Sequence, residues 1–367
     1  MPSDLIDARQ LSPALTERVE LAQELIAISG ERSSSAFPRL IRPTLQPWFA
    51  STLMRIKCRS EPTCLIQRKN APAPLAYASA TIEPTGVAAV TFKNLLTVTG
   101  PNQGEGDLKL AANLCEQVGA HLSMLVLELA APPSGGEYAA VVSPAWLEER
   151  QAELKRLEKR ISDVAGFLSQ TAVSADLSDD YPDVGWADDV IGRRARYADL
   201  TILGPDLLAS HTLKDKVIEG TLFSSGKPIL LVPEGARPTL KPKRILVAWD
   251  ARPESSRAVR ESLDMLKGAE DVRLVIVDPI GDEFHHGEEP GADAAAYLAR
   301  HGVKVTVDRL PSANHSIADV LRQHAGDVAA ELMVMGAYGH SRLRERIFGG
   351  VTKSMLEGQS LPVLMAR

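Results

Sequence analysis

Short apolar runs alternate with amphipathic stretches from about residue 92 onward. Four runs predict strands in the first part of this region, at 92–98, 122–129, 200–204 and 228–232. Between them, 107–118 and the long, charged stretch 145–168 have the apolar spacing of amphipathic helices. This order of strands and helices is typical of a parallel sheet that is covered by helices on both faces. The pattern therefore predicts an α/β fold.

The same order is repeated after a proline-rich stretch at 233–243. Five apolar runs predict strands at 244–250, 272–278, 303–309, 331–337 and 362–366, with helices near 254–267, 291–301, 315–327 and 351–358. Two pairs of segments also match. ADLTILGPDLL and AELMVMGAYGH are offset by 132 (331 minus 199), and GKPILLVPEG and SLPVLMAR by 134 (362 minus 228). A near-constant offset indicates an internal duplication. We predict a first domain at 91–233, a linker at 233–243 and a second domain at 243–367.

Residues 1–86 lack this pattern. Amphipathic spacing occurs once, at 15–29, and prolines, serines and scattered basic residues follow without a period. Such a stretch has too little patterned apolar surface to offset the entropy lost on ordering. We predict a leader that is disordered or poorly packed. A sharper hypothesis places the true coding start near Val87, so that 1–86 lies outside it.

Composition and charge exclude several classes of protein. The net charge is -6 and the pI is about 5.8, which removes the general attraction to phosphate backbones that nucleic-acid-binding proteins show. The three cysteines, Cys58, Cys64 and Cys115, have neither metal-ligand nor disulfide-framework spacing. No apolar run approaches the roughly 18 residues that a membrane span needs, and the first residues do not resemble a signal peptide. We expect a cytoplasmic protein with no membrane or nucleic-acid partner.

Four glycines surround a basic stretch near the end of the chain. Their spacing is Gly-x2-Gly-x9-Gly, from Gly336 through Gly339 to Gly349, with Gly350 next. A glycine at a strand exit lets the backbone approach a ligand. Gly349 and Gly350 precede an expected helix start, where free N–H groups and the helix dipole favour an anion. The loop also carries Arg342, Arg344 and Arg346. We interpret it as a phosphate-binding loop; the alternative is that the glycines form turns and the arginines are solvated.

These residues resemble a known family. GAYGHSRLRERIFGG followed by VT, together with KRILVAWDARPESSRAV, is similar to the nucleotide-binding branch of the universal stress protein family, whose pattern is Gly-x2-Gly-x9-Gly-Ser/Thr. The resemblance covers 243–367 and, more weakly, 91–233. It implies two universal-stress-protein-like domains in tandem, each with a Rossmann-like parallel sheet of strand order 3-2-1-4-5. It also implies ATP, with Mg²⁺ on its phosphates, at the carboxyl ends of the strands, where such sheets bind ligands.

The resemblance implies a set of binding residues. Asp250 and Val277 would frame adenine and ribose; Gly336 and Gly339 would line the ribose and phosphate path; Gly349, Gly350 and Val351 would cradle the phosphates. This sequence departs from the family at Gly350, where Ser or Thr is expected. The N–H is kept, but the lost hydroxyl hydrogen bond to a charged group is worth roughly 1.5–3 kcal/mol. From the residues alone, Asp250 could equally cap the helix that follows.

The first domain departs further from the pattern. Its first strand ends in 97–100 without a carboxylate, and the glycine after Gly204 is Gly220, 16 residues on (220 minus 204) instead of 13 (349 minus 336). The segment between them carries acids that would repel a triphosphate: Asp206, Asp215 and Glu219. We predict one nucleotide site per chain, in the second domain. Two family domains pair about a two-fold axis, so the duplication would build this pair within one chain; a homodimer is the other arrangement.

The sequence predicts no catalytic residue and no metal ligand. His340 lies in the glycine loop without a carboxylate at a fixed spacing to orient it. The acidic, histidine-containing loop at 281–290 is most simply solvated, with a metal site as the alternative. We therefore predict an ATP-binding regulatory or stress-response protein with little or no hydrolysis. Two alternatives are a ligand-free interaction module and an enzyme of the adenylyl-transfer or pyrophosphatase type.

Overall fold

A computed structural model describes residues 92–130, 144–279, 289–337, 350–358 and 360–367. The described residues belong to one compact unit, Glu83–Arg367. Several predictions fall outside the described residues: the leader at 1–86 with the alternative start at Val87, the loop at 281–288, and residues 338–349 with Gly339, His340, Gly349 and the three arginines.

The elements of the first half follow the predicted order. They are β1 (Asn94–Thr99), α3 (Gly106–Val118), β2 (His121–Leu127), α4 (Pro144–Ser169), β3 (Ala175–Asp180), the single turn Val184–Trp186, α5 (Ala187–Ala195), β4 (Leu200–Leu203), α6 (Pro205–Leu208), α7 (His211–Glu219), the wide turn Gly220–Ser225 and β5 (Ile229–Leu231). Each strand that an apolar run predicts is present, with its bounds shifted by at most two residues.

The second half repeats this succession. It contains β6 (Arg244–Ala248), α8 (Pro253–Glu261), α9 (Leu263–Gly268), β7 (Asp271–Val277), α10 (Ala292–Arg300), β8 (Val305–Leu310), α11 (Ile317–Asp327), β9 (Leu332–Gly336), α12 (Gly350–Glu357) and β10 (Val363–Ala366). The predicted helix at 254–267 is divided at Ser262, whose buried hydroxyl donates to the carbonyl oxygens of Ala258 (2.8 Å) and Val259 (3.2 Å). Such a side-chain bond to the preceding turn favours a bend.

One sheet of ten strands runs through both halves. Its order is β3-β2-β1-β4-β5-β10-β9-β6-β7-β8, so the strand order within each half is 3-2-1-4-5. Neighbouring strands are parallel within each half. The halves meet where β5 pairs with β10 in antiparallel register, with Leu231 opposite Val363 and Ile229 opposite Met365. The predicted α/β class with a mostly parallel sheet is confirmed.

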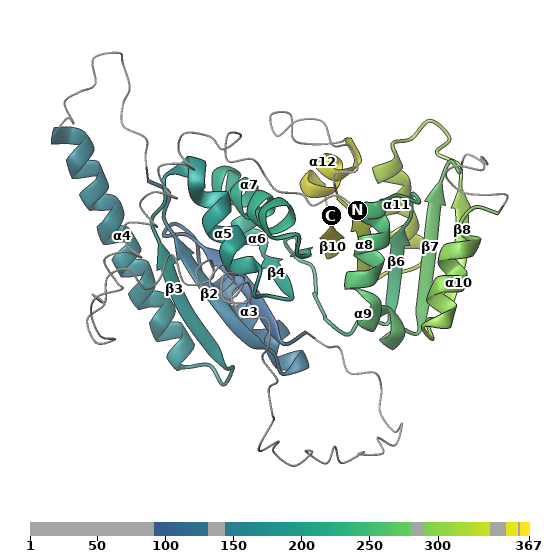
Figure 1. Ribbon diagram of the computed structural model, residues 1–367, viewed down its shortest axis with the longest axis horizontal. Helices are drawn as coiled ribbons and strands as arrows, with labels where there is room; N and C mark the ends of the chain where they lie inside the picture. Colours follow the sequence, from purple (N-terminus) through teal and green to yellow (C-terminus); the bar gives the residue numbers. More distant parts are fainter. Residues whose placement is uncertain (1–91, 131–143, 280–288, 338–349, 359) are drawn as a thin grey trace, which may run out of the picture. The chain divides into compact units, whose positions relative to one another are not determined.

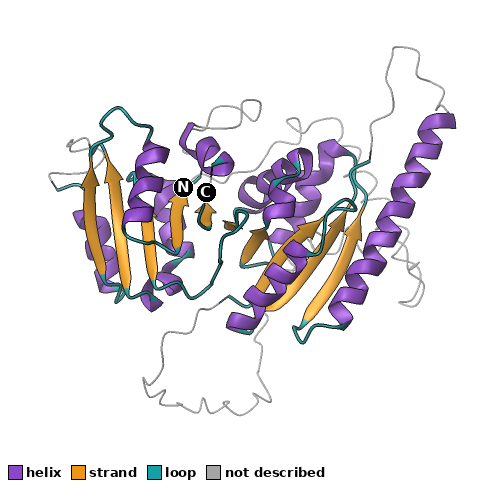
Figure 2. Cartoon of the chain, turned by 180° about the vertical axis from the view of Figure 1, so that it is seen from behind, coloured by secondary structure: helices purple, strands orange, loops and turns teal. Residues whose placement is uncertain are grey.

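Helices cover the two faces of the sheet, as Figures 1 and 2 show. Successive strand residues point to opposite faces: Leu95 of β1 packs into a core with residues of α3, α4, α8, α9 and α10, whereas Leu96 packs into a second core with residues of α5, α7, α11 and α12. Both cores include side chains from the two halves. The apolar runs are therefore nearly continuous, because the central strands are buried on both faces.

The predicted linker at 233–243 packs against the first half. Leu240 is fully buried, and its N–H donates to Gln117 Oε1 of α3 at 3.0 Å. The hydroxyl of Thr239 donates to the same oxygen, also at 3.0 Å. The connection is thus anchored by one apolar side chain and two hydrogen bonds.

Sequence patterns missed β3 and the helices α5, α6 and α7. The strand β3 has the sequence ADLSDD, and aspartate is disfavoured in strands. It forms because its backbone pairs with β2 over the whole run from Ala175 opposite Leu122 to Asp180 opposite Leu127. As the edge strand it is only half-buried, so the cross-strand hydrogen bonds compensate for weak propensity.

Candidate functional site

The carboxyl ends of β6, β7 and β9 lie side by side at one edge of the sheet in the second half. β6 lies between the other two strands, with Ala248 opposite Val275 of β7 and Met335 of β9. From β6 the chain continues to β7 on one side, whereas β9 lies on the other side. The order of the strands reverses at this point, and open α/β sheets bind ligands outside such a switch point. The structure places Asp250, Val277 and Gly336 at this edge.

Asp250 lies two residues beyond the end of β6. Its Oδ1 accepts the N–H of Arg252 at 3.1 Å, and its Oδ2 lies 3.9 Å from Arg252 Nε. Ala251 between them has a positive φ of 59°. The carboxylate therefore stabilises the tight turn before α8, but it does not cap this helix, whose N-cap residue Arg252 has no side-chain cap hydrogen bond. The side chain is also 59% exposed, so a ligand can reach the carboxylate.

Gly336 has a structural role at the end of β9. A Cβ atom at this position would lie 2.5 Å from Ser255 N and 2.7 Å from the carbonyl carbon of Glu254. Both are backbone atoms of the first turn of α8, which packs directly on the strand end. The buried Ser255 stabilises this turn, because its hydroxyl donates to Arg252 O at 2.9 Å. Glycine is thus required here for close packing, whether or not a ligand binds.

Val277 ends β7 and is partly buried against the core on the α11 face. The next residue, Asp278, has a positive φ of 48° and accepts the N–H of Ser312 at 2.8 Å. Hydrogen bonds from the side chain and backbone of Ser312 hold the pKa of Asp278 below its usual value. Sequence reasoning did not include this second carboxylate, although its position directly after a buried strand was a usable signal.

Gly350 and Val351 begin α12. Gly350 is exposed, with open space where a Cβ atom would be, and Val351 is partly buried against the core. The following Thr352 is buried. Gly339 and Gly349 lie outside the described residues. The described part of the predicted phosphate cradle is therefore the start of this helix.

The first half has charged side chains at the same kind of edge. Of the acids that were predicted to repel phosphates, Glu219 forms an ion pair with Lys216 at 3.0 Å. Asp206 lies two residues after Gly204, and its carboxylate would lie 3.0 Å from a Cβ atom placed on Gly104. A further carboxylate, that of Asp107, is buried at this edge. Sequence reasoning missed Asp107, because it begins an amphipathic helix and follows no strand.

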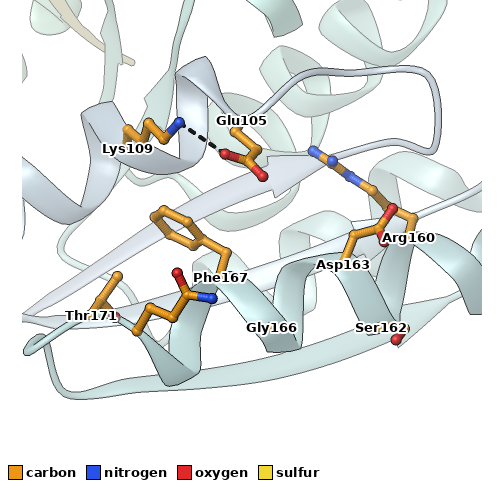
Figure 3. A pocket seen from close by; sticks show the side chains of 9 residues that line it. Glu105, Lys109, Arg160, Ser162, Asp163, Gly166, Phe167 and Thr171 are labelled. Carbon is orange, nitrogen blue, oxygen red and sulfur yellow. Dashed lines mark ion pairs between the residues drawn. The ribbon is translucent and has the colours of Figure 1, made fainter.

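A groove of about 750 Å³ lies in the first half, between α3 and α4 (Figure 3). It is lined by Glu105, Lys109, Arg160, Ser162, Asp163, Gly166, Phe167, Gln170 and Thr171. Two ion pairs border it: Lys109 binds Glu105 at 2.8 Å, and Lys159 of α4 binds Asp163 at 2.6 Å. The guanidinium of Arg160 donates to two neutral acceptors, Thr99 Oγ1 and Gly104 O. The groove belongs to the first half, and none of the predicted binding residues lines it.

Among the described residues, no three His, Cys, Asp or Glu side chains are grouped closely enough to hold a metal ion. No helix within the same residues is both long and apolar enough to cross a membrane.

Comparison with known proteins identifies the family of the second half. Residues 241–367 match the model of the universal stress protein family. The second half carries a universal stress protein domain. The curated universal stress protein Slr1230 of Synechocystis is 30% identical over 158 residues, which are 41% of this chain and 50% of that protein. The chain thus spans about half the length of the curated relative that it matches.

A solved universal stress protein shares the fold. One from Archaeoglobus fulgidus DSM 4304 is 17% identical, with a TM-score of 0.55 over 76% of this chain and 98% of that chain. Another, crystallised in complex with cAMP, is 18% identical, with a TM-score of 0.29 over 35% of this chain and 98% of that chain. At such low identity the Archaeoglobus likeness shows the α/β fold alone.

Proposed function

We propose that the second half binds an adenine nucleotide, ATP with Mg²⁺ on its phosphates, and that the chain is a tandem universal stress protein with a regulatory or stress-response role. The nucleotide would lie at the carboxyl ends of β6, β7 and β9. Asp250 and Val277 would frame adenine and ribose, Gly336 and Gly339 the ribose and phosphate path, and Gly349, Gly350 and Val351 the phosphates. The first half would act as the intramolecular partner, paired through β5 and β10.

The observation that carries this proposal is the convergence of Asp250, Val277 and Gly336 at one switch point in the universal stress domain. The exposed carboxylate of Asp250 can accept hydrogen bonds from a purine or ribose. The start of α12 supplies backbone N–H groups, and the dipole of this eight-residue helix favours the phosphates. No described residue at this edge forms the pair of nucleophile and oriented base that rapid hydrolysis needs, so we expect slow turnover or none.

The test is a binding titration of the full chain. Any nucleotide that co-purifies is first extracted and identified; ATP with Mg²⁺, and cAMP as a comparison ligand, are then titrated by calorimetry. Asp250→Ala is expected to weaken binding about 10- to 100-fold, the loss of hydrogen bonds to a charged group. Asp293→Ala, an exposed aspartate of α10, is the matched control and should bind as wild type does. Gly349→Asp would place a negative charge beside the predicted phosphates and should abolish binding.

Each result has a definite meaning. Saturable binding that Asp250→Ala weakens and Asp293→Ala leaves unchanged would support the proposed site. Phosphate release or pyrophosphate formation at many turnovers per minute would contradict the regulatory role and favour an enzyme. No binding of ATP at millimolar concentration would overturn the proposal and leave an interaction module.

A further inference from the structure

The carboxylate of Asp107 is bound inside the first half. Asp107 is the second residue of α3 and is only 3% exposed. Its Oδ1 accepts the N–H of Asp206 at 3.1 Å, and its Oδ2 accepts the N–H of Leu207 at 2.8 Å. These two N–H groups belong to α6, the short helix that begins at Pro205, just beyond the end of β4. An anion therefore already occupies the carboxyl end of β4, and the chain itself supplies it.

The carboxylate of Asp107 occupies the space where a side chain at position 204 would lie. A Cβ atom on Gly204 would lie 2.2 Å from Asp107 Oδ1, too close for any real contact. The backbone of Gly204 is extended, with φ −86°, which any residue can adopt. Glycine is therefore needed at this position to admit the carboxylate, and a turn geometry does not explain it.

A buried guanidinium supports the same arrangement. Arg160 of α4 is 6% exposed and donates from Nη2 to Thr99 Oγ1 and to Gly104 O, both at 2.7 Å. Thr99 ends β1 and Gly104 lies in the connection to α3, so the arginine ties α4 to the segment that leads to Asp107. Burial raises the pKa of Asp107, whereas its two N–H donors and the charge of Arg160 oppose that rise. Arg160 thus holds the connection between β1 and α3 in place, and Asp107 lies three residues beyond Gly104.

The second half has the corresponding positions but a different bond pattern. Gly336 matches Gly204 at the offset of 132, and Glu254 matches Asp107 as the second residue of the first helix after the central strand. Glu254 Oε2 is buried and has no hydrogen-bond partner in the part of the chain that the structure describes. Both carboxylate oxygens of Asp107 therefore accept hydrogen bonds, whereas at least one carboxylate oxygen of Glu254 has no partner among the described residues. Residues 338 and 339, which match Asp206 and Leu207 at the same offset, lie outside the described residues.

We propose that Asp107 is an internal ligand: its carboxylate holds the carboxyl edge of the first half closed in the absence of any nucleotide. The inference extends the proposed function, since it explains why only the second half would respond to ATP. The first half would be a permanently closed partner for a domain whose edge depends on an outside anion.

Hydrogen exchange of the full chain tests the internal ligand directly. In wild type, the amides of Asp206 and Leu207 should be protected without nucleotide. Asp107→Ala, and the isosteric Asp107→Asn in case the alanine variant fails to fold, should accelerate their exchange by roughly 10- to 100-fold, as expected for lost hydrogen bonds to a charged acceptor. Asp179→Ala, at an exposed aspartate of β3, is the matched control and should leave both amides unchanged.

A double-mutant cycle tests the role of Gly204. Gly204→Ala alone should lower the midpoint temperature of thermal unfolding, because the added Cβ atom displaces the carboxylate of Asp107. Combined with Asp107→Ala it should lower the midpoint by less than the two single changes together, because the carboxylate that the Cβ would strike is gone. Strictly additive effects would overturn the proposal that this glycine accommodates the carboxylate.

Addition of ATP with Mg²⁺ separates the two proposals. If both proposals hold, ATP should slow the hydrogen exchange of backbone amides at 249–255 and leave the exchange rates at 99–107 and 204–208 unchanged. Protection of the first-half segments by ATP in wild type, or fast exchange at residues 206 and 207 that Asp107→Asn does not alter, would overturn the internal ligand. No response anywhere to ATP, with the Asp107 effects intact, would overturn only the nucleotide site.

Discussion

Gly336→Ala is the substitution whose outcome the structure determines most directly. The added Cβ would lie 2.5 Å from Ser255 N, 2.7 Å from Glu254 C and 2.9 Å from Glu254 Cβ. Two of these atoms belong to backbone, so no rotamer change relieves the contact, and the first turn of α8 must move away from β9. Overpacking of this kind typically costs about 1–3 kcal/mol.

The assay is thermal unfolding of the full chain, with Gly350→Ala as the matched control. For domains of this size, 1 kcal/mol corresponds to about 2–4 °C, so a cost of about 1–3 kcal/mol means that Gly336→Ala should lower the Tm by about 2–12 °C. Gly350 has open space around it in the first turn of α12, and alanine is favoured over glycine in helices by up to about 1 kcal/mol. Gly350→Ala should therefore leave the Tm unchanged or raise it. A Gly336→Ala variant that melts at the wild-type temperature would refute the packing argument.

Three further predictions concern the linker, the second carboxylate and the buried thiol. Leu240→Ala leaves a cavity at a fully buried site and should lower the free energy of unfolding, measured in urea, by about 2–5 kcal/mol. Leu240→Met should change this free energy little, because it keeps the volume of the side chain. If the two variants lose equal stability, Leu240 does not anchor the linker. The lowered pKa of Asp278 contributes stability that is complete above its unfolded pKa of about 3.9 and is lost as pH falls through the folded value. The free energy of unfolding of Ser312→Ala should therefore fall less than that of wild type between pH 6 and 3. Identical decreases would show that Ser312 does not lower the pKa of Asp278. Burial raises the pKa of Cys115 to about 12, so a thiol reagent should modify its peptide only after unfolding, as mass spectrometry would show; rapid native labelling would contradict its burial.

The parts of the candidate site that were predicted lie on strongly patterned strands. Asp250, Val277 and Gly336 each follow or end a buried apolar run, and parallel strands bring such ends to one edge. The internal carboxylate of Asp107 could not be predicted, because its partners at 206 and 207 are about 100 residues away in the sequence. Neither could the close contact of Gly336 with Glu254 and Ser255, which depends on how α8 packs over β9.

By itself, the sequence determined the elements with strong apolar patterns, their repeated order and the α/β class, because side chains buried on both faces of a strand must be apolar wherever they occur. Only the tertiary structure decided that ADLSDD is the edge strand β3, since pairing with β2 supplies hydrogen bonds that its polar residues do not favour alone. Only the tertiary structure also placed β5 against β10, which joins the halves into one sheet. These contacts connect residues far apart in the chain, and local patterns carry no information about which distant backbone groups will meet.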